Sequence, residues 1–204
     1  MRACPLMVSK PGWTRLPFWL AFWLLVGPAA ADSPPKQDRS WKQYRNQQLG
    51  YCVSYPNRWL KGEAFEGAGF YVATGLKKYS RPLGEIDVGV LPPLPTDAPH
   101  TTDISLTENL QAHLDGLKTF ERARNMEVLE KRSMQFLGSP ALFMKDRYYD
   151  PQDRHMWIDE VVFVQRENRL FRFELECSAD QLERFEPVFT RLLSSFQFEC
   201  GRTQ

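Results

Sequence analysis

The sequence predicts an α+β domain in which helices cover a mainly antiparallel sheet. Three observations predict this class. Apolar and polar residues alternate in several short runs between residues 49 and 177, which is the pattern of half-buried strands. Short turns separate the last four of these runs, as in an antiparallel meander. Two other segments, 105–120 and 178–196, carry apolar residues at helical spacing.

The stretch at 49–59 carries the most specific strand signal. Its alternating apolar residues are Tyr51, Val53 and Tyr55. Pro56 is expected to end the strand, because proline has no N–H to donate. Trp59 follows as a large apolar anchor. This stretch therefore predicts a short strand whose aromatic face packs into the core.

The remaining elements follow in chain order. Strands are predicted at 69–74, 84–91, 126–137, 141–149, 156–165 and 169–177. The proline-rich segment 92–102 is interpreted as a stiff surface connection. The helix at 105–120 begins with a capping box of Ser105 and Glu108. The last helix is expected to begin at Ser178 and to break at Pro187, because a proline inside a helix costs about 3 kcal/mol.

The N-terminus has the pattern of a secretory signal peptide at residues 1–31. Basic residues precede an apolar stretch at 16–26, and the alanines at 29–31 form a small-residue cleavage site. A retained membrane anchor is the alternative, but the apolar stretch is short for a span. We expect a flexible leader at 32–40, one domain at 41–200 and a disordered tail at 201–204. The protein is expected to be exported, either periplasmic or extracellular.

The numbers of basic and acidic residues indicate which kind of partner is not expected. The chain has 26 basic and 25 acidic residues, and removal of residues 1–31 leaves 23 and 25. A nucleic-acid-binding domain is normally clearly basic, so this class is not expected. We expect a monomer with a protein partner of unknown identity.

Three cysteines remain after residue 31, namely Cys52, Cys177 and Cys200. Export makes a disulfide plausible, but spacing alone does not give its connectivity. Cys177 and Cys200 each continue the apolar face of an alternating run, whereas Cys52 lies opposite the aromatic face of its strand. This alternation favours a Cys177–Cys200 bridge with Cys52 free. A bridge from Cys52 to either partner and three reduced thiols are the alternatives.

The sequence resembles the PsbP-like family, named for an extrinsic subunit of photosystem II. The resemblance depends on an opening block, on the turn at 138–141 and on a closing block that ends in Ser-Phe. The residues that carry the opening and closing blocks are Gly50, Tyr51, Val53, Tyr55, Pro56, Trp59, Phe189, Leu192, Leu193, Ser195 and Phe196. The resemblance implies an α/β/α sandwich and an accessory or binding domain. It identifies no metal ligand in this chain.

No established catalytic motif is present in the sequence, so an enzyme is not predicted. The polar cluster at Asp146–Glu160 is the best candidate for ligand chemistry. Asp150, Asp153 and His155 offer carboxylate and imidazole ligands that suit a divalent metal ion. The alternative is an ordinary turn in which aspartates accept backbone N–H groups. Beyond this metal we expect no cofactor, and a small-ligand or metal-binding module is the alternative to a partner-binding domain.

Overall fold

The computed structural model describes residues 40–63, 69–75, 81–91, 102–119, 123–167 and 169–200, with side chains of the first helix described from residue 106. The predicted signal peptide, almost all of the predicted leader and the predicted tail lie outside these residues, as does most of the proline-rich segment. All described residues belong to one compact unit, Asp38–Gln204.

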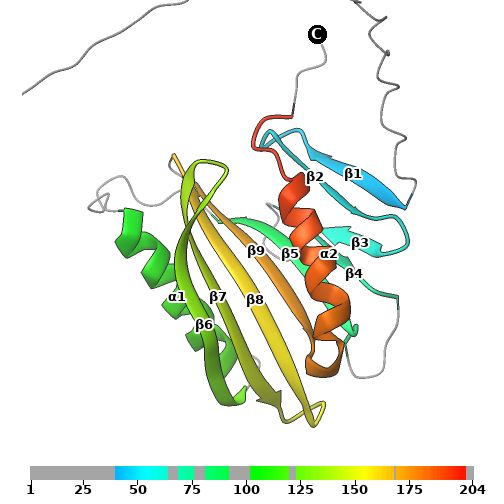
Figure 1. Cartoon of the computed structure of the whole chain (residues 1–204), viewed down its shortest axis with the longest axis vertical. Coiled ribbons are helices and arrows are strands. Elements are labelled where there is room, and N and C mark those ends of the chain that lie inside the picture. The colour runs from blue at the N-terminus through cyan, green and yellow to red at the C-terminus, as the bar shows by residue number, and fades with distance from the viewer. Residues whose placement is uncertain are drawn as a thin grey trace, which may run out of the picture. The chain divides into compact units, whose positions relative to one another are not determined.

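A seven-stranded sheet with the strand order β3-β4-β5-β9-β8-β7-β6 forms the centre of this unit (Figure 1). All neighbouring strands in it are antiparallel. Its strands are β3 (Leu60–Glu63), β4 (Phe70–Ala73), β5 (Gly84–Leu91), β6 (Arg124–Phe136), β7 (Ser139–Asp150), β8 (His155–Arg166) and β9 (Arg169–Ser178). The predicted α+β class with a mainly antiparallel sheet is therefore confirmed, including the meander from β6 to β9.

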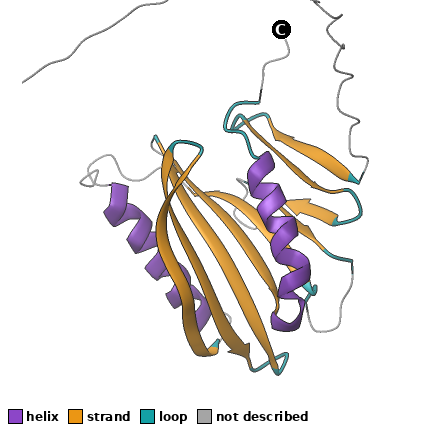
Figure 2. Ribbon diagram, viewed as in Figure 1, coloured by secondary structure: helices purple, strands orange, loops and turns teal. Residues whose placement is uncertain are grey.

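Two helices pack against this sheet (Figure 2), α1 (Thr102–Thr119) and α2 (Leu182–Ser195), the latter preceded by the short 3₁₀ helix η1 (Ala179–Gln181). In β7, Leu142 and Met144 pack with Leu110 of α1. The intervening Phe143 belongs to the cluster that contains Phe185 of α2. Because side chains alternate along a strand, the two helices contact opposite faces of the sheet.

The stretch around Tyr51 forms a hairpin apart from the large sheet. Strand β2 (Tyr51–Pro56) pairs antiparallel with β1 (Trp41–Asn46), for which no strand is predicted from the sequence. The hairpin turn ends at Gly50, whose φ of +76° is a conformation that favours glycine. Pro56 is the last residue of β2, as expected of a residue that cannot extend the ladder.

The opening and closing blocks of the sequence pack together. The ring of Tyr51 is fully buried and stacks on Phe196 with centroids 5.4 Å apart. Trp59 meets Phe185 of α2 edge-on at 5.7 Å. The backbone N–H of Ser54 donates to Oγ of Ser195 at 2.8 Å. Val53 and Tyr55 are buried in the same core.

The predicted break at Pro187 is wrong, because α2 is continuous through it. Pro187 removes the hydrogen bond that residue 187 would donate to the carbonyl of Glu183. Both residues are exposed, so water can solvate that carbonyl. The start at Ser178 is also wrong, since Ser178 is the last residue of β9.

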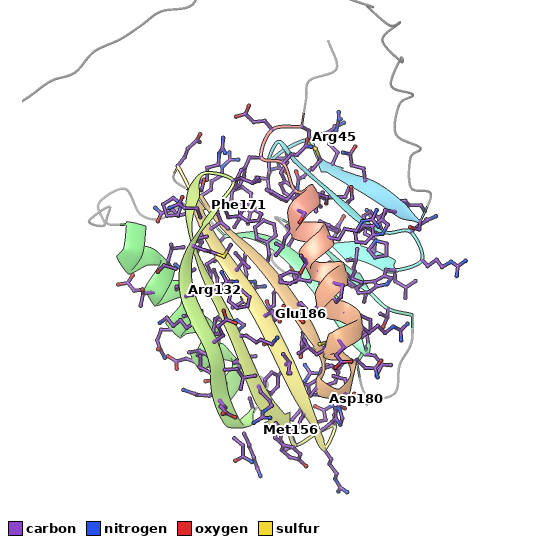
Figure 3. All side chains as sticks on the ribbon, in the orientation of Figure 1. Arg45, Arg132, Met156, Phe171, Asp180 and Glu186 are labelled. Carbon is purple, nitrogen blue, oxygen red and sulfur yellow. A yellow bond between two sulfur atoms is a disulfide. The ribbon has the colours of Figure 1, made fainter. Side chains whose placement is uncertain are left out.

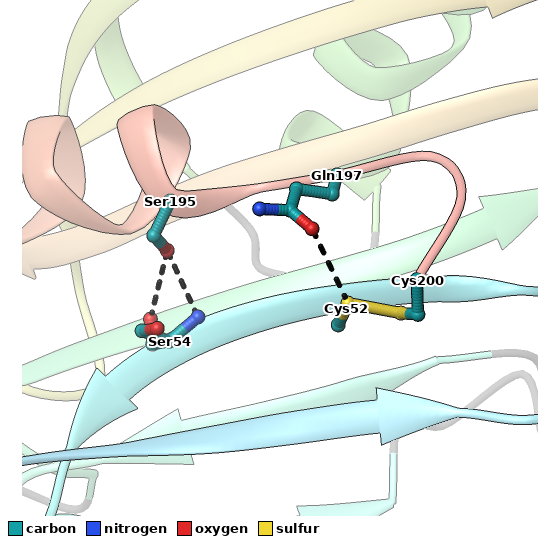
Figure 4. Close-up of a disulfide and its surroundings, with 5 residues drawn as sticks. All are labelled: Cys52, Ser54, Ser195, Gln197 and Cys200. Atoms are coloured by element: carbon teal, nitrogen blue, oxygen red, sulfur yellow. Dashed lines mark hydrogen bonds between the residues drawn. A yellow bond between two sulfur atoms is a disulfide. The ribbon is translucent and has the colours of Figure 1, made fainter. Parts of the chain in front are cut away.

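The predicted disulfide between Cys177 and Cys200 is wrong as well. Cys52 is bonded to Cys200, with Cα atoms 5.6 Å apart (Figure 4). Cys177 is a free, buried thiol. The alternation of apolar and polar residues correctly predicted that Cys177 is buried. It did not show which strand lies beside the segment that follows α2. That segment runs beside β2, where N–H of Gln197 donates to the carbonyl of Cys52 at 2.9 Å.

Candidate functional site

A pocket of about 790 Å³ lies where the β1–β2 turn, the β8–β9 turn and the C-terminal segment meet. We call it the arginine pocket. Its basic residues are Arg45, Arg166 and Arg169, its apolar residues Leu49, Phe171 and Phe198, and its acidic residues Glu167 and Glu199. In Figure 3, Arg45 and Phe171 lie at this end of the sheet, and Met156 and Asp180 lie at the other end.

Three local features position the arginines. Arg45 is exposed near the end of β1. Arg166 and Arg169 stand on either side of the tight β8–β9 turn, where Glu167 has a φ of +57°. The guanidinium of Arg166 lies 4.4 Å from the ring centroid of Phe198 and 3.5 Å from Oε1 of Glu199. Arg169 donates to the carbonyl of Leu49 at 3.4 Å.

The C-terminal segment forms one wall of the pocket, and the disulfide fixes it in place. Cys200 is bonded to Cys52, and its N–H donates to the carbonyl of Gly50 at 3.1 Å. Phe198 is thereby held against Phe171, with ring centroids 5.1 Å apart. Phe171 is buried and Phe198 is half-buried, and guanidinium groups beside such a partly exposed ring can bind a carboxylate or another anion together with an apolar group.

The three predicted metal ligands contact two different sets of groups in the structure. Asp150 and Asp153 both face Arg81, whose guanidinium nitrogens lie 2.8 Å and 3.6 Å from their carboxylate oxygens. Asp150 also accepts the backbone N–H groups of Gln152 at 2.6 Å and Asp153 at 3.2 Å. This is the turn geometry given above as the alternative to a metal site.

His155 engages a different set of groups. Its Nε2 lies 2.6 Å from Oγ of Ser178 and 3.6 Å from Oδ1 of Asp180. The metal role of Asp150, Asp153 and His155 stays a prediction, and the described contacts already provide each of them with a partner.

Neither Cys52 nor Cys177 has a free and accessible sulfur in this structure. Cys52 is in the disulfide. Cys177 is fully buried, and burial together with Asp159 and Glu160 raises the pKa of its thiol. A high pKa keeps a thiol protonated and unreactive.

The arginine pocket was not predicted from the sequence. Its three arginines come from positions 45, 166 and 169, and no local charge run marks them. Tertiary contacts bring these segments together, among them the Cys52–Cys200 disulfide, the packing of Phe198 on Phe171 and the hydrogen bond from Arg169 to Leu49.

Comparison with known proteins supports the fold. No protein-family model and no curated protein matches the chain. The solution structure of cyanobacterial PsbP (CyanoP) from Synechocystis sp. PCC 6803 has a TM-score of 0.58 and 17% identity, covering 84% of this chain and 99% of that one. LpqN of Mycobacterium tuberculosis, which is involved in cell envelope biogenesis, has a TM-score of 0.49 and 10% identity, covering 77% and 89%.

The chain is thus an α+β protein with an antiparallel sheet. More specifically, it has a PsbP-like fold, as the resemblance of the sequence predicted. The similarity to PsbP, at 17% identity, shows a shared fold and nothing about function. The similarity to LpqN is weaker and adds nothing to this conclusion. Any function has to be argued from the site.

Proposed function

We propose that the protein is an exported, non-catalytic binding domain that docks a partner protein through the arginine pocket. The domain would act as a monomeric accessory unit, with the α/β/α sandwich that the family resemblance implies. The observation that carries the proposal is the convergence of Arg45, Arg166 and Arg169 beside the half-buried ring of Phe198. Arginine and aromatic side chains are the residue types that most often dominate binding energy at protein interfaces.

The disulfide supports export to an oxidising compartment. Disulfides persist in periplasmic and extracellular proteins and are rare in the reducing cytosol. The Cys52–Cys200 bridge joins two ends of the domain. Among the described residues, no helix has the length and apolarity needed to cross a bilayer.

The chemistry of the pocket indicates the kind of partner. Three guanidinium groups favour an acidic segment, and Leu49, Phe171 and Phe198 favour an apolar side chain next to it. Glu167 and Glu199 lie at the same site and would repel a partner whose acidic groups are placed differently. We therefore propose a partner segment with a carboxylate beside an apolar residue.

Charge reversal tests this proposal. The tagged protein is isolated from cell envelopes after mild crosslinking, as the wild type and as the Arg45→Glu, Arg169→Glu double variant. We expect the double variant to recover at least tenfold less of any partner that the wild type captures specifically. Lys131→Glu is the matched control, because Lys131 is exposed on β6 and does not line the pocket. Equal recovery of the same partner by all three proteins would contradict docking at the pocket.

A further inference from the structure

A second polar site lies on the opposite side of the sheet from α2, under α1. His113 of α1, Asp146 of β7 and Asp159 of β8 each direct a ligand atom to one point, and these atoms lie within 4.8 Å of one another. Nε2 of His113 lies 3.7 Å from Oδ2 of Asp159. We call these three residues the His113 cluster.

The cluster is buried and lacks hydrogen bonds. Asp146 and Asp159 are 0% exposed, and the side chain of His113 is 6% exposed. Among the described residues, none provides a hydrogen bond to either carboxylate or to Nε2 of His113. Buried carboxylates without partners are costly, so this arrangement needs a compensating group.

The surrounding charges provide that compensation only in part, because the charge of Arg81 acts on Asp159 but is outweighed by burial and the neighbouring acids. Glu174 lies 3.8 Å from Nδ1 of His113 and adds a further carboxylate. The nearest arginines on this face are engaged with other acids. Arg172 contacts Glu174 at 3.3 Å and Asp87 at 4.0 Å, and Arg81 pairs with Glu176, Asp150 and Asp153.

Burial and this excess of acidic groups also shift the pKa values of the two aspartates. Burial, followed by the charges of Glu174 and Glu176, raises the pKa of Asp146 to about 7. Burial and the neighbouring acids also raise the pKa of Asp159. Burial lowers the pKa of His113, which keeps its imidazole neutral and able to act as a ligand.

We propose that His113, Asp146 and Asp159 bind a divalent transition-metal ion of the Zn²⁺ type, which fastens α1 to the sheet. One imidazole nitrogen and two carboxylate oxygens suit Zn²⁺ or Mn²⁺, whereas Ca²⁺ needs six or more oxygen ligands. Ligand atoms around a tetrahedral Zn²⁺ are about 3.4 Å apart, given metal–ligand distances of about 2.1 Å. The 3.7 Å pair is close to this spacing, and because all three ligand atoms lie within 4.8 Å of one another, small side-chain adjustments would bring the third to the same spacing.

The site would have a structural role. Its ligands come from three elements, and α1 otherwise rests on the sheet through Leu106, Leu110 and Leu117. A bound ion would add a bridge between His113 and the two strands. This inference does not depend on the arginine pocket, which involves other residues.

The test is a titration of the tag-free, metal-free protein with Zn²⁺ and Mn²⁺, followed by calorimetry and thermal unfolding. We expect one Zn²⁺ per chain, a rise in Tm of several degrees on saturation, and no comparable effect of Ca²⁺. Asp146→Asn and Asp159→Asn should each weaken Zn²⁺ binding at least tenfold. Both variants should keep or exceed the Tm of the metal-free wild type, since each removes a buried carboxylate from an acidic cluster.

Asp153→Asn is the matched control and should leave Zn²⁺ binding unchanged, because Asp153 lies in the β7–β8 turn beside Arg81. The proposal is overturned if the metal-free protein binds neither Zn²⁺ nor Mn²⁺. It is also overturned if Asp146→Asn and Asp159→Asn bind Zn²⁺ as the wild type does, or if Asp153→Asn or His155→Ala abolishes the binding instead.

Discussion

Cys52 of β2 is disulfide-bonded to Cys200, the last residue that the structure describes at the C-terminal end. The bond joins residues 148 positions apart and closes almost the whole domain into one covalent loop. It also fixes the segment that carries Phe198 and Glu199 at the edge of the arginine pocket. Stability and the proposed binding site therefore depend on the same bridge.

The first prediction concerns this disulfide. Non-reducing peptide mapping should recover a Cys52–Cys200 peptide, with Cys177 alkylated only after unfolding. Cys52→Ser should lower the free energy of unfolding by about 3–5 kcal/mol in urea, because the open chain gains conformational entropy when it unfolds. A Cys177–Cys200 peptide would contradict the connectivity described above.

The second prediction concerns the contact between the two sequence blocks. Ser195→Ala removes the acceptor of the Ser54 N–H and should cost about 1–2 kcal/mol in the free energy of unfolding. Ser194→Ala is a matched control, since Oγ of Ser194 donates only within α2, to the carbonyl of Thr190. The control should cost a few tenths of a kcal/mol. Equal effects of both changes would mean that the Ser54–Ser195 contact does not tie β2 to α2.

The third prediction concerns pH and applies to the metal-free protein. The pKa of Asp146 is about 7 in the folded protein, against an ordinary value of 3.8. Between these values the folded chain holds a proton that the unfolded chain has released, so the free energy of unfolding falls as pH rises from about 4 to 7. The fall due to Asp146 is on the order of 3 kcal/mol.

Asp146→Asn checks this prediction, because an amide does not titrate. Asp159 acts in the same direction as Asp146, and His113, whose pKa is lowered, acts in the opposite direction. The informative quantity is therefore the difference between the variant and the wild type in urea unfolding from pH 4 to 7. If that difference stays constant across the range, Asp146 does not carry the proposed proton.

The sequence predicted the sheet well because its strands alternate and its turns are short. The strands β6 to β9 and the burial of Tyr51 and Val53 follow from local periodicity. The two sequence blocks that carry the resemblance to the PsbP-like family contact each other in the structure, through Ser54 with Ser195 and Tyr51 with Phe196. Local periodicity does not show which residues become neighbours in space, and local sequence signals also misplaced the start of α2 at Ser178 and a break at Pro187.

The disulfide and both sites show this limit. Alternation placed Cys177 on an apolar face, but only the path of the chain after α2 brings Cys200 to Cys52. His113 lies on a helix with a leucine stripe, and nothing in its local sequence indicates that it packs over the face of the sheet that carries Asp146 and Asp159. Aspartates at the inward positions of β7 and β8 were the one available signal, because carboxylates are rarely buried without a partner.

The central claim is that a partner docks at the arginine pocket, and site-specific photocrosslinking in intact cells tests it most directly. A photoreactive side chain replaces Gln47, which is exposed and lines the pocket, or Lys131 on β6 as the control. We predict one discrete crosslinked product from position 47, none of that mass from position 131, and loss of the product in the Arg45→Glu, Arg169→Glu background. No product from position 47, or the same product from both positions, would contradict the claim.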